Sequence, residues 1–208
     1  MSPADTVGVL KDFYEDLWER LPADLVPPDF ARRRDFMLSE VRPGERVLDL
    51  GCGAGPFTVE LLKRTESVIA VEVAEAALRR ARTAAPAADH RLATIDGPLP
   101  LADASVDVVW ASEVIEHVSD TGLWLGEIRR VLVPGGRLLV TTPSHGRLRV
   151  LARGIEALSE PLGDHLHLYT ARSLRMVLGD LEFTEIAVRT AGGHPLMRRL
   201  LIARAVSA

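Results

Sequence analysis

The chain has 208 residues, of which 47% are hydrophobic and 26% are charged, and its formal net charge is −4. This length and composition predict one globular domain with a buried core. The acidic balance gives no overall basic surface for nucleic acid. No apolar run approaches the 18 or so residues that a membrane span requires, so none is expected.

The cysteine content and the N-terminus indicate a cytoplasmic protein. Cys52 is the single cysteine, so no internal disulfide can form and a reducing compartment is expected. The first 20 residues carry acidic side chains throughout and no apolar segment, so they do not predict a signal peptide. Lysine occurs only at Lys11 and Lys63 while arginine and alanine are abundant, which is typical of a GC-rich bacterial genome.

Hydrophobic periodicity predicts helices and strands in alternation. The first helix has Val9, Phe13 and Leu17 on one face, and a proline-rich connector separates it from a second helix capped by Asp29. The predicted helices cover 5–20, 29–40, 56–65, 74–84, 120–132, 146–158 and 171–179, the last capped by Thr170. The predicted strands cover 46–50, 67–73, 90–96, 106–112, 137–143, 181–190 and 196–206.

This alternation predicts an α/β fold, with a parallel sheet covered by helices on both faces. The last two strands depart from the pattern, because only the five residues AGGHP (191–195) separate them. A parallel crossover needs a dozen or more residues. The final strand is therefore expected to run antiparallel to its neighbours.

The stretch VLDLGCGAGPFT (47–58) predicts a binding loop at the end of a buried strand. Asp49 is followed by Gly51, Gly53 and Gly55, and such a turn exposes backbone N–H groups at a helix N-terminus. The third glycine comes one position too early for a dinucleotide loop. A ligand with an ammonium group beside a carboxylate would suit Asp49 and the loop amides together. The alternative is a tight strand–helix turn without a ligand.

These residues resemble the first motif of the class I S-adenosylmethionine (SAM)-dependent methyltransferases, D/E-x-G-x-G-x-G. The resemblance covers roughly residues 40–190 and also includes LVPGGRLLVTTP (132–143). It implies a doubly wound, Rossmann-like sheet of seven strands in the order 3-2-1-4-5-7-6, with strand 7 antiparallel. It further implies that Glu72 binds the ribose hydroxyls, that Asp96 accepts the adenine amino group and that the Gly97 N–H meets a ring nitrogen. The expected cofactor-binding residues are Tyr14, Asp49, Gly51, Cys52, Gly53, Gly55, Glu72, Val73, Asp96, Gly97 and Glu113.

A second cluster follows the fourth strand. Glu113, Glu116 and His117 have the spacing i, i+3, i+4, which places all three on one side of a helical turn. With His165 in the later segment DHLHLYT, they resemble ubiquinone-pathway O-methyltransferases and enzymes that 2′-O-methylate RNA 3′ ends. In both, an E-x-x-E-H cluster is associated with a divalent metal. The resemblance implies Mg, Mn or Zn held by Glu113, Glu116, His117 and His165. In the alternative, Glu113 only flanks the sulfonium and His117 only orients the helix.

The combined motifs predict a SAM-dependent methyltransferase that acts on a small-molecule acceptor, with a hydroxyl as the expected acceptor group. The candidate bases are His117, His145 and His165. The whole chain is expected to form one methyltransferase domain, with a helical lid over 1–40 and a catalytic core over 41–208 that carries a lid insertion at 144–170. The alternatives are a metal-dependent RNA 3′-end 2′-O-methyltransferase, which the acidic net charge disfavours, and a non-catalytic SAM-binding module. The acceptor and the oligomeric state stay open.

Overall fold

A computed structural model describes residues 3–22, 24–95, 97–146, 150–151, 154, 165–194 and 198–208. The helices are α1 (Pro3–Arg20), α2 (Phe30–Glu40), α3 (Pro56–Leu62), α4 (Glu75–Ala84), α5 (Thr121–Val131) and α8 (Ala171–Asp180). The strands are β1 (Val47–Leu50), β2 (Val68–Glu72), β3 (Asp89–Leu92), β4 (Val106–Ser112), β5 (Leu132–Pro143), β6 (Phe183–Ala191) and β7 (Leu200–Ser207).

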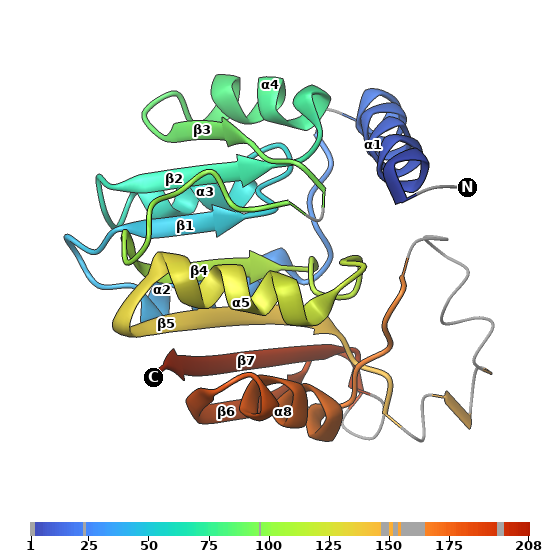
Figure 1. The fold of residues 1–208 in the computed structure, drawn as a ribbon, viewed down its shortest axis with the longest axis vertical. Coiled ribbons are helices and arrows are strands. Elements are labelled where there is room, and N and C mark those ends of the chain that lie inside the picture. Colours follow the sequence, from blue (N-terminus) through green and yellow to red (C-terminus); the bar gives the residue numbers. More distant parts are fainter. Residues whose placement is uncertain are drawn as a thin grey trace.

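The strands form one seven-stranded sheet in the order β3-β2-β1-β4-β5-β7-β6. Neighbours from β3 to β5 pair in parallel, whereas β7 pairs antiparallel with both β5 and β6. The predicted strand order and the antiparallel final strand are therefore confirmed. The arrowheads of the parallel strands point toward α1, so their carboxyl ends share one edge of the sheet (Figure 1).

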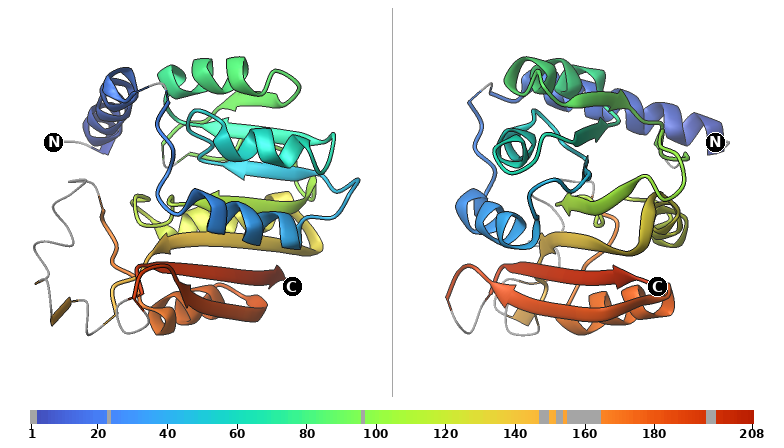
Figure 2. Two further views of the ribbon diagram at one scale, coloured as in Figure 1. Left: turned by 180° about the vertical axis from the view of Figure 1, so that it is seen from behind. Right: turned by 90° about the vertical axis from the view of Figure 1, so that its left-hand side faces the viewer.

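Helices cover both faces of the sheet and bury an apolar core on each (Figure 2). On one face α5 and α8 contribute Leu125, Ile128 and Leu174 to a cluster with β4 and β5. On the other face α2 and α3 pack against the sheet, and their side chains surround the fully buried Trp110. Because both faces are covered, the central strands are apolar on both sides, as parallel strands usually are.

Two local predictions need correction. Asp29 precedes α2 in a left-handed conformation with φ 53° and makes no side-chain cap. Its carboxylate instead accepts hydrogen bonds from Arg199 at 2.7 and 2.9 Å, a partner 170 residues away in the chain. The fifth strand begins at Leu132 rather than at residue 137, so the PGG segment lies within β5.

Other boundaries behave as expected. Thr170 caps α8 with a reciprocal capping box, in which its hydroxyl accepts from the Ser173 N–H at 3.1 Å. The predicted helix over 146–158 lies largely outside the described residues. In the described part of the chain, no helix combines the length and apolarity that crossing a bilayer requires.

Candidate active site

A cavity of about 730 Å³ opens at the carboxyl ends of β1, β2 and β4. The loop after β1, the ends of β2 and β4, and helix α1 contribute to its wall, together with Leu21, Pro22, Leu25, Pro27 and Pro28 before α2 and with Ala93, Thr94, Ile95, Gly97, Pro98 and Leu99 after β3. The predicted site residues that line it are Tyr14, Gly51, Cys52, Gly53, Glu72, Val73, Gly97, Glu113, Glu116, His117 and His165. Asp96 lies outside the described residues.

The first two glycines of the loop bring its backbone to the cavity wall. Gly51 and Gly53 have φ of +74° and +55°, a region that strongly favours glycine. A Cβ on Gly51 would stand 2.5 Å from a Val114 methyl, and one on Gly53 would stand 2.8 Å from the Trp18 ring. Neither position can therefore carry a side chain without displacing a neighbour.

Gly55 and His145 do not line the cavity among the described residues. Gly55 begins α3 with φ +83°, and a Cβ there would lie 3.2 Å from Ala81 of α4, so this glycine allows two helices to approach. His145 is buried, and its backbone N–H donates to the Tyr169 carbonyl at 2.8 Å. Gly55 thus has a packing role, and His145 is buried outside the described lining of the cavity.

Two buried carboxylates lie beneath the loop. Glu72 accepts hydrogen bonds from the backbone N–H groups of Gly53 at 2.9 Å, Val73 at 2.7 Å and Ala74 at 3.2 Å. Burial raises the pKa of Glu72, and these three donors oppose the rise. Asp49 is also buried, and it is not among the described residues that line the cavity.

The Asp49 Oδ2 accepts from the Thr58 hydroxyl at 2.6 Å. Burial raises the pKa of Asp49 to about 7, although this hydrogen bond lowers it. Burial therefore favours the protonated form of both carboxyl groups.

The cluster after β4 differs from the predicted helical arrangement. Residues 113–118 form a turn, and Glu113 itself is left-handed with φ +58°. This backbone directs the Glu113 carboxylate toward Arg33, whose Nη1 lies 3.8 Å from Oε1, and toward the Thr141 hydroxyl at 3.2 Å. Glu113 is therefore absent from the group of potential metal ligands that the described residues form.

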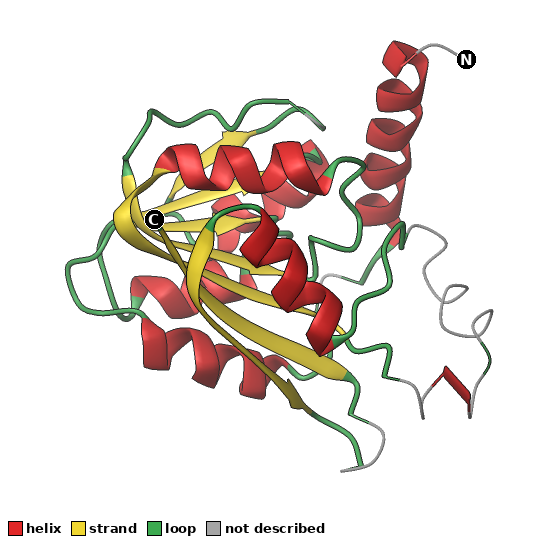
Figure 3. Cartoon of the chain, turned by 60° about the horizontal axis from the view of Figure 1, so that its bottom comes forward, coloured by secondary structure: helices red, strands yellow, loops and turns green. Residues whose placement is uncertain are grey.

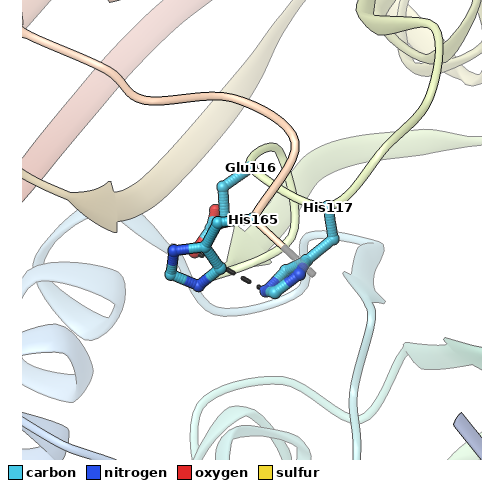
Figure 4. Close-up of side chains that lie close together, drawn as sticks. All are labelled: Glu116, His117 and His165. Carbon is cyan, nitrogen blue, oxygen red and sulfur yellow. Dashed lines mark ion pairs between the residues drawn. The ribbon is translucent and has the colours of Figure 1, made fainter. Parts of the chain in front are cut away.

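The other three predicted ligands do converge. Ligand atoms of Glu116, His117 and His165 lie within 4.8 Å of one another (Figure 4). We call these three residues the acid–histidine cluster. The His117 and His165 rings meet edge to face with centroids 4.8 Å apart, and His117 Nε2 is 4.0 Å from Glu116 Oε1. The backbone carbonyl of Glu116 accepts from the N–H groups of Leu166 and His167 at 2.8 and 3.1 Å, which fixes the later segment beside the turn.

Glu116 is fully buried at the base of the cluster. Its Oε2 accepts from the Thr142 hydroxyl at 2.9 Å, while Oε1 has no hydrogen-bond partner among the described residues. Burial, with the Glu113 charge adding to it, raises the pKa of Glu116 to about 8. Burial therefore favours the protonated, uncharged form of Glu116.

Arg33 and Trp18 are cavity residues that the sequence reasoning missed. The buried Arg33 guanidinium donates to the Ser112 hydroxyl at 2.9 Å and stacks on the Phe57 ring, with its Cζ 5.4 Å from the ring centroid. In the run Arg32–Arg34, only Arg33 shares the i, i+3, i+4 spacing of Phe36 and Met37. That spacing marks Arg33 as the inward-facing member of the run.

Comparisons with known proteins agree with the geometry. A family of methyltransferase domains matches residues 48–140. Malonyl-[acyl-carrier protein] O-methyltransferase of Erwinia pyrifoliae is 39% identical over 115 residues, which cover 54% of this chain and 44% of the relative. The biotin biosynthesis bifunctional protein BioHC of Cellvibrio japonicus is 31% identical over 168 residues, which cover 73% of this chain and 34% of the relative.

A solved structure shows the same fold. A SAM-dependent methyltransferase of Thermotoga maritima superposes with a TM-score of 0.67 at 23% identity, over 86% of this chain and 92% of that one. The curated relatives named above are longer, and this chain spans about a third to a half of their length. The domain match, the strand order and the glycine loop together identify the chain as a member of the class I SAM-dependent methyltransferases.

Proposed function

We propose that this chain transfers the methyl group of SAM to a hydroxyl group of a small-molecule acceptor. The observation that carries the proposal is that a single cavity joins the glycine loop and Glu72 on one side to His117 and His165 on the other. The cofactor and the acceptor would then meet within one enclosed space. Orientation and the exclusion of water supply most of the catalytic effect in such a site.

The cofactor would lie along the wall formed by the glycine loop and the end of β2. Glu72 supplies a two-oxygen acceptor for the ribose hydroxyls. The buried positive charge of Arg33, whose guanidinium donates to Ser112 at the end of β4, favours the methionyl carboxylate.

Transfer is a direct displacement. The acceptor oxygen attacks the methyl carbon, the C–S bond breaks, and the products are a methyl ether, S-adenosylhomocysteine and a proton. His117 takes that proton, because its imidazole lines the cavity. A positioned base of this kind contributes on the order of 10²–10⁴-fold.

A carboxylate acceptor is the second candidate. Its support is the 39% identity to a malonyl-[acyl-carrier protein] O-methyltransferase, together with the buried cation of Arg33 near the cavity. A carboxylate is already ionised at neutral pH, so its methylation needs no base. The two candidates therefore differ in their dependence on His117.

The test compares two radiolabelled transfer assays, one with a catechol and one with the malonyl thioester of pantetheine. For a hydroxyl acceptor, we expect His117→Gln to lower the rate about 100-fold or more. The matched control His194→Gln alters an exposed histidine and should leave the rate unchanged. Methylation of the thioester alone, with no effect of His117→Gln, would overturn the hydroxyl proposal in favour of the carboxylate. Cofactor binding with no transfer to either compound, or to an RNA 3′ end, would support a non-catalytic module.

A divalent cation is a competing role for the acid–histidine cluster. One carboxylate and two imidazoles within 4.8 Å form a donor set that suits Zn or Mn. Metal binding would displace the proton that burial favours on Glu116, because a ligating carboxylate is deprotonated. Calorimetric titration with Zn²⁺ or Mn²⁺ tests it: tight binding that His165→Ala abolishes would assign His117 to a metal instead of to proton transfer.

A further inference from the structure

Helix α4 is capped by a side chain from another helix. Its own N-cap residue, Ala74, has no side chain that could accept a hydrogen bond. The Glu15 carboxylate of α1 takes this role, accepting from the backbone N–H groups of Glu75 at 2.7 Å and Ala76 at 2.9 Å. Glu15 thereby satisfies two donors that a helix N-terminus otherwise leaves to solvent.

This cap anchors a helix that otherwise stands apart. Figure 3 shows α1 as a separate rod beyond the carboxyl edge of the sheet, and α4 is the element that it contacts most. Glu19 of α1 also pairs with Arg79 of α4, but both side chains are more than half exposed, so this ion pair stabilises little. Glu15 is therefore the principal polar attachment of α1.

The same turn of α1 reaches both halves of the cavity. The Trp18 ring lies directly against Gly53 of the glycine loop. Tyr14, four residues earlier and so on the same face, meets the His117 ring edge to face at a centroid distance of 6.5 Å. Glu15 lies between them in sequence, so the position of both rings depends on where this carboxylate holds the helix.

We propose that Glu15 is a positioning residue, which by capping α4 holds Trp18 as a roof over the bound cofactor and Tyr14 against His117. The inference rests on the proposed function, because the ligand beneath the roof is taken to be SAM. The cavity of about 730 Å³ is present with α1 in place, so the docked helix covers the space and does not fill it. This volume lies within the range of roughly 300–1,000 Å³ found for small-molecule sites.

The position of the cap couples it to the cofactor-binding acid. Helix α4 begins three residues after Glu72, and the N–H groups of Val73 and Ala74 bind the Glu72 carboxylate. The N–H groups of four consecutive residues, 73–76, are therefore used in turn: the first two donate to Glu72 of β2 and the next two to Glu15 of α1. Burial opposes ionisation of Glu15, but the bonds from Ala76 and Glu75 hold its pKa below the usual value, so the cap is charged at neutral pH.

The test measures S-adenosylhomocysteine binding by calorimetry for the wild type, Glu15→Ala and Glu15→Gln. We expect Glu15→Ala to weaken binding about fivefold, the factor that corresponds to loss of a helix cap. Glu15→Gln keeps one acceptor oxygen and should fall between the two. The matched control is Asp16→Ala, which removes the exposed neighbouring acid that pairs with Arg20 and should bind as the wild type does.

Limited trypsin digestion provides a readout that needs no ligand. Lys11 and Arg20 are cleavage sites within α1, so the rate of cleavage after them reports detachment of the helix. Cleavage should be faster in Glu15→Ala than in Asp16→Ala, with unchanged far-ultraviolet circular dichroism. Wild-type binding and cleavage rates in Glu15→Ala would overturn the proposal. If the wild type binds no S-adenosylhomocysteine, the proposed function fails, whereas the digestion still tests the attachment of α1.

Discussion

The two halves of the cavity are built in different ways. The cofactor half comes from two adjacent strand ends, and its main features are backbone groups: the turn at Gly51 and Gly53, and the N–H donors that surround the Glu72 carboxylate. The acceptor half is made of side chains: His117 from the turn after β4, His165 from the later segment, and Tyr14 of α1 beside His117. A site made of backbone is specified by a short local motif, whereas one made of side chains depends on the whole fold.

The largest effect should come from breaking the backbone of the cofactor half. Gly53→Val places a β-branched side chain at φ +55° and against the Trp18 ring, so the loop must move. We expect calorimetry to detect no SAM binding. Gly44→Val, which places the same side chain at φ +81° in open space outside the cavity lining, is the matched control. Wild-type affinity in Gly53→Val would contradict the assignment of the loop.

The second-largest effect should come from changing Glu72, whose carboxylate the backbone N–H groups of the cofactor half hold in place. Glu72→Ala should weaken SAM binding by about 2–3 kcal/mol, the range for hydrogen bonds to a charged group. Glu75→Ala, which removes the nearby half-exposed acid that pairs with Arg82, serves as the control. Equal affinities for the two variants would show that Glu72 does not hold the ribose.

The third prediction concerns Glu116 in the acceptor half, and it is measured as the pH dependence of the free energy of unfolding. Its folded pKa of about 8 lies above the ordinary glutamate value of 4.5, so the folded state retains a proton that the unfolded chain has lost. Stability from this group is complete below pH 4.5 and is lost as the pH rises through 8. Glu116→Gln mimics the protonated form, so denaturation at pH 8.5 should show it more stable than the wild type by about 1–3 kcal/mol. Parallel pH profiles for both proteins would contradict the shift.

The smallest expected effect is on cofactor binding when the acceptor half alone is changed. His165→Ala removes an imidazole ring that packs edge to face against His117. His165 belongs to the acceptor half and not to the glycine loop. SAM affinity should stay within about twofold of the wild type, because the loop and Glu72 do not depend on it. A tenfold loss would mean that the two halves are not independent.

The sequence predicts most of the fold because local patterns encode it. The alternation of strands and helices, the capping box at Thr170 and the short connection before β7 all required no long-range information. Two local predictions failed where a distant partner intervened. Asp29 gives its carboxylate to Arg199, and Glu113 adopts a left-handed backbone and turns toward Arg33.

The same distinction explains which site residues could be predicted. The glycines and Glu72 belong to a motif with fixed spacing, whereas Arg33 and Trp18 reach the cavity only because α2 and α1 pack beside it. A run of three arginines usually lies on an exposed helix face. Only the spacing of Arg33 from Phe36 and Met37 indicates that its side chain points inward. The convergence of His165 with His117 could be expected from topology, but the departure of Glu113 from that group could not.

The most direct test is a crystal structure of the chain with S-adenosylhomocysteine bound. The ribose hydroxyls should hydrogen-bond to Glu72, the homocysteine group should lie along Gly51 and Gly53, and the sulfur should face the open space beside His117. A ligand that occupies the cavity with its ribose away from Glu72, or with its sulfur turned away from His117, would contradict the assignment of one half to the cofactor and the other to the acceptor.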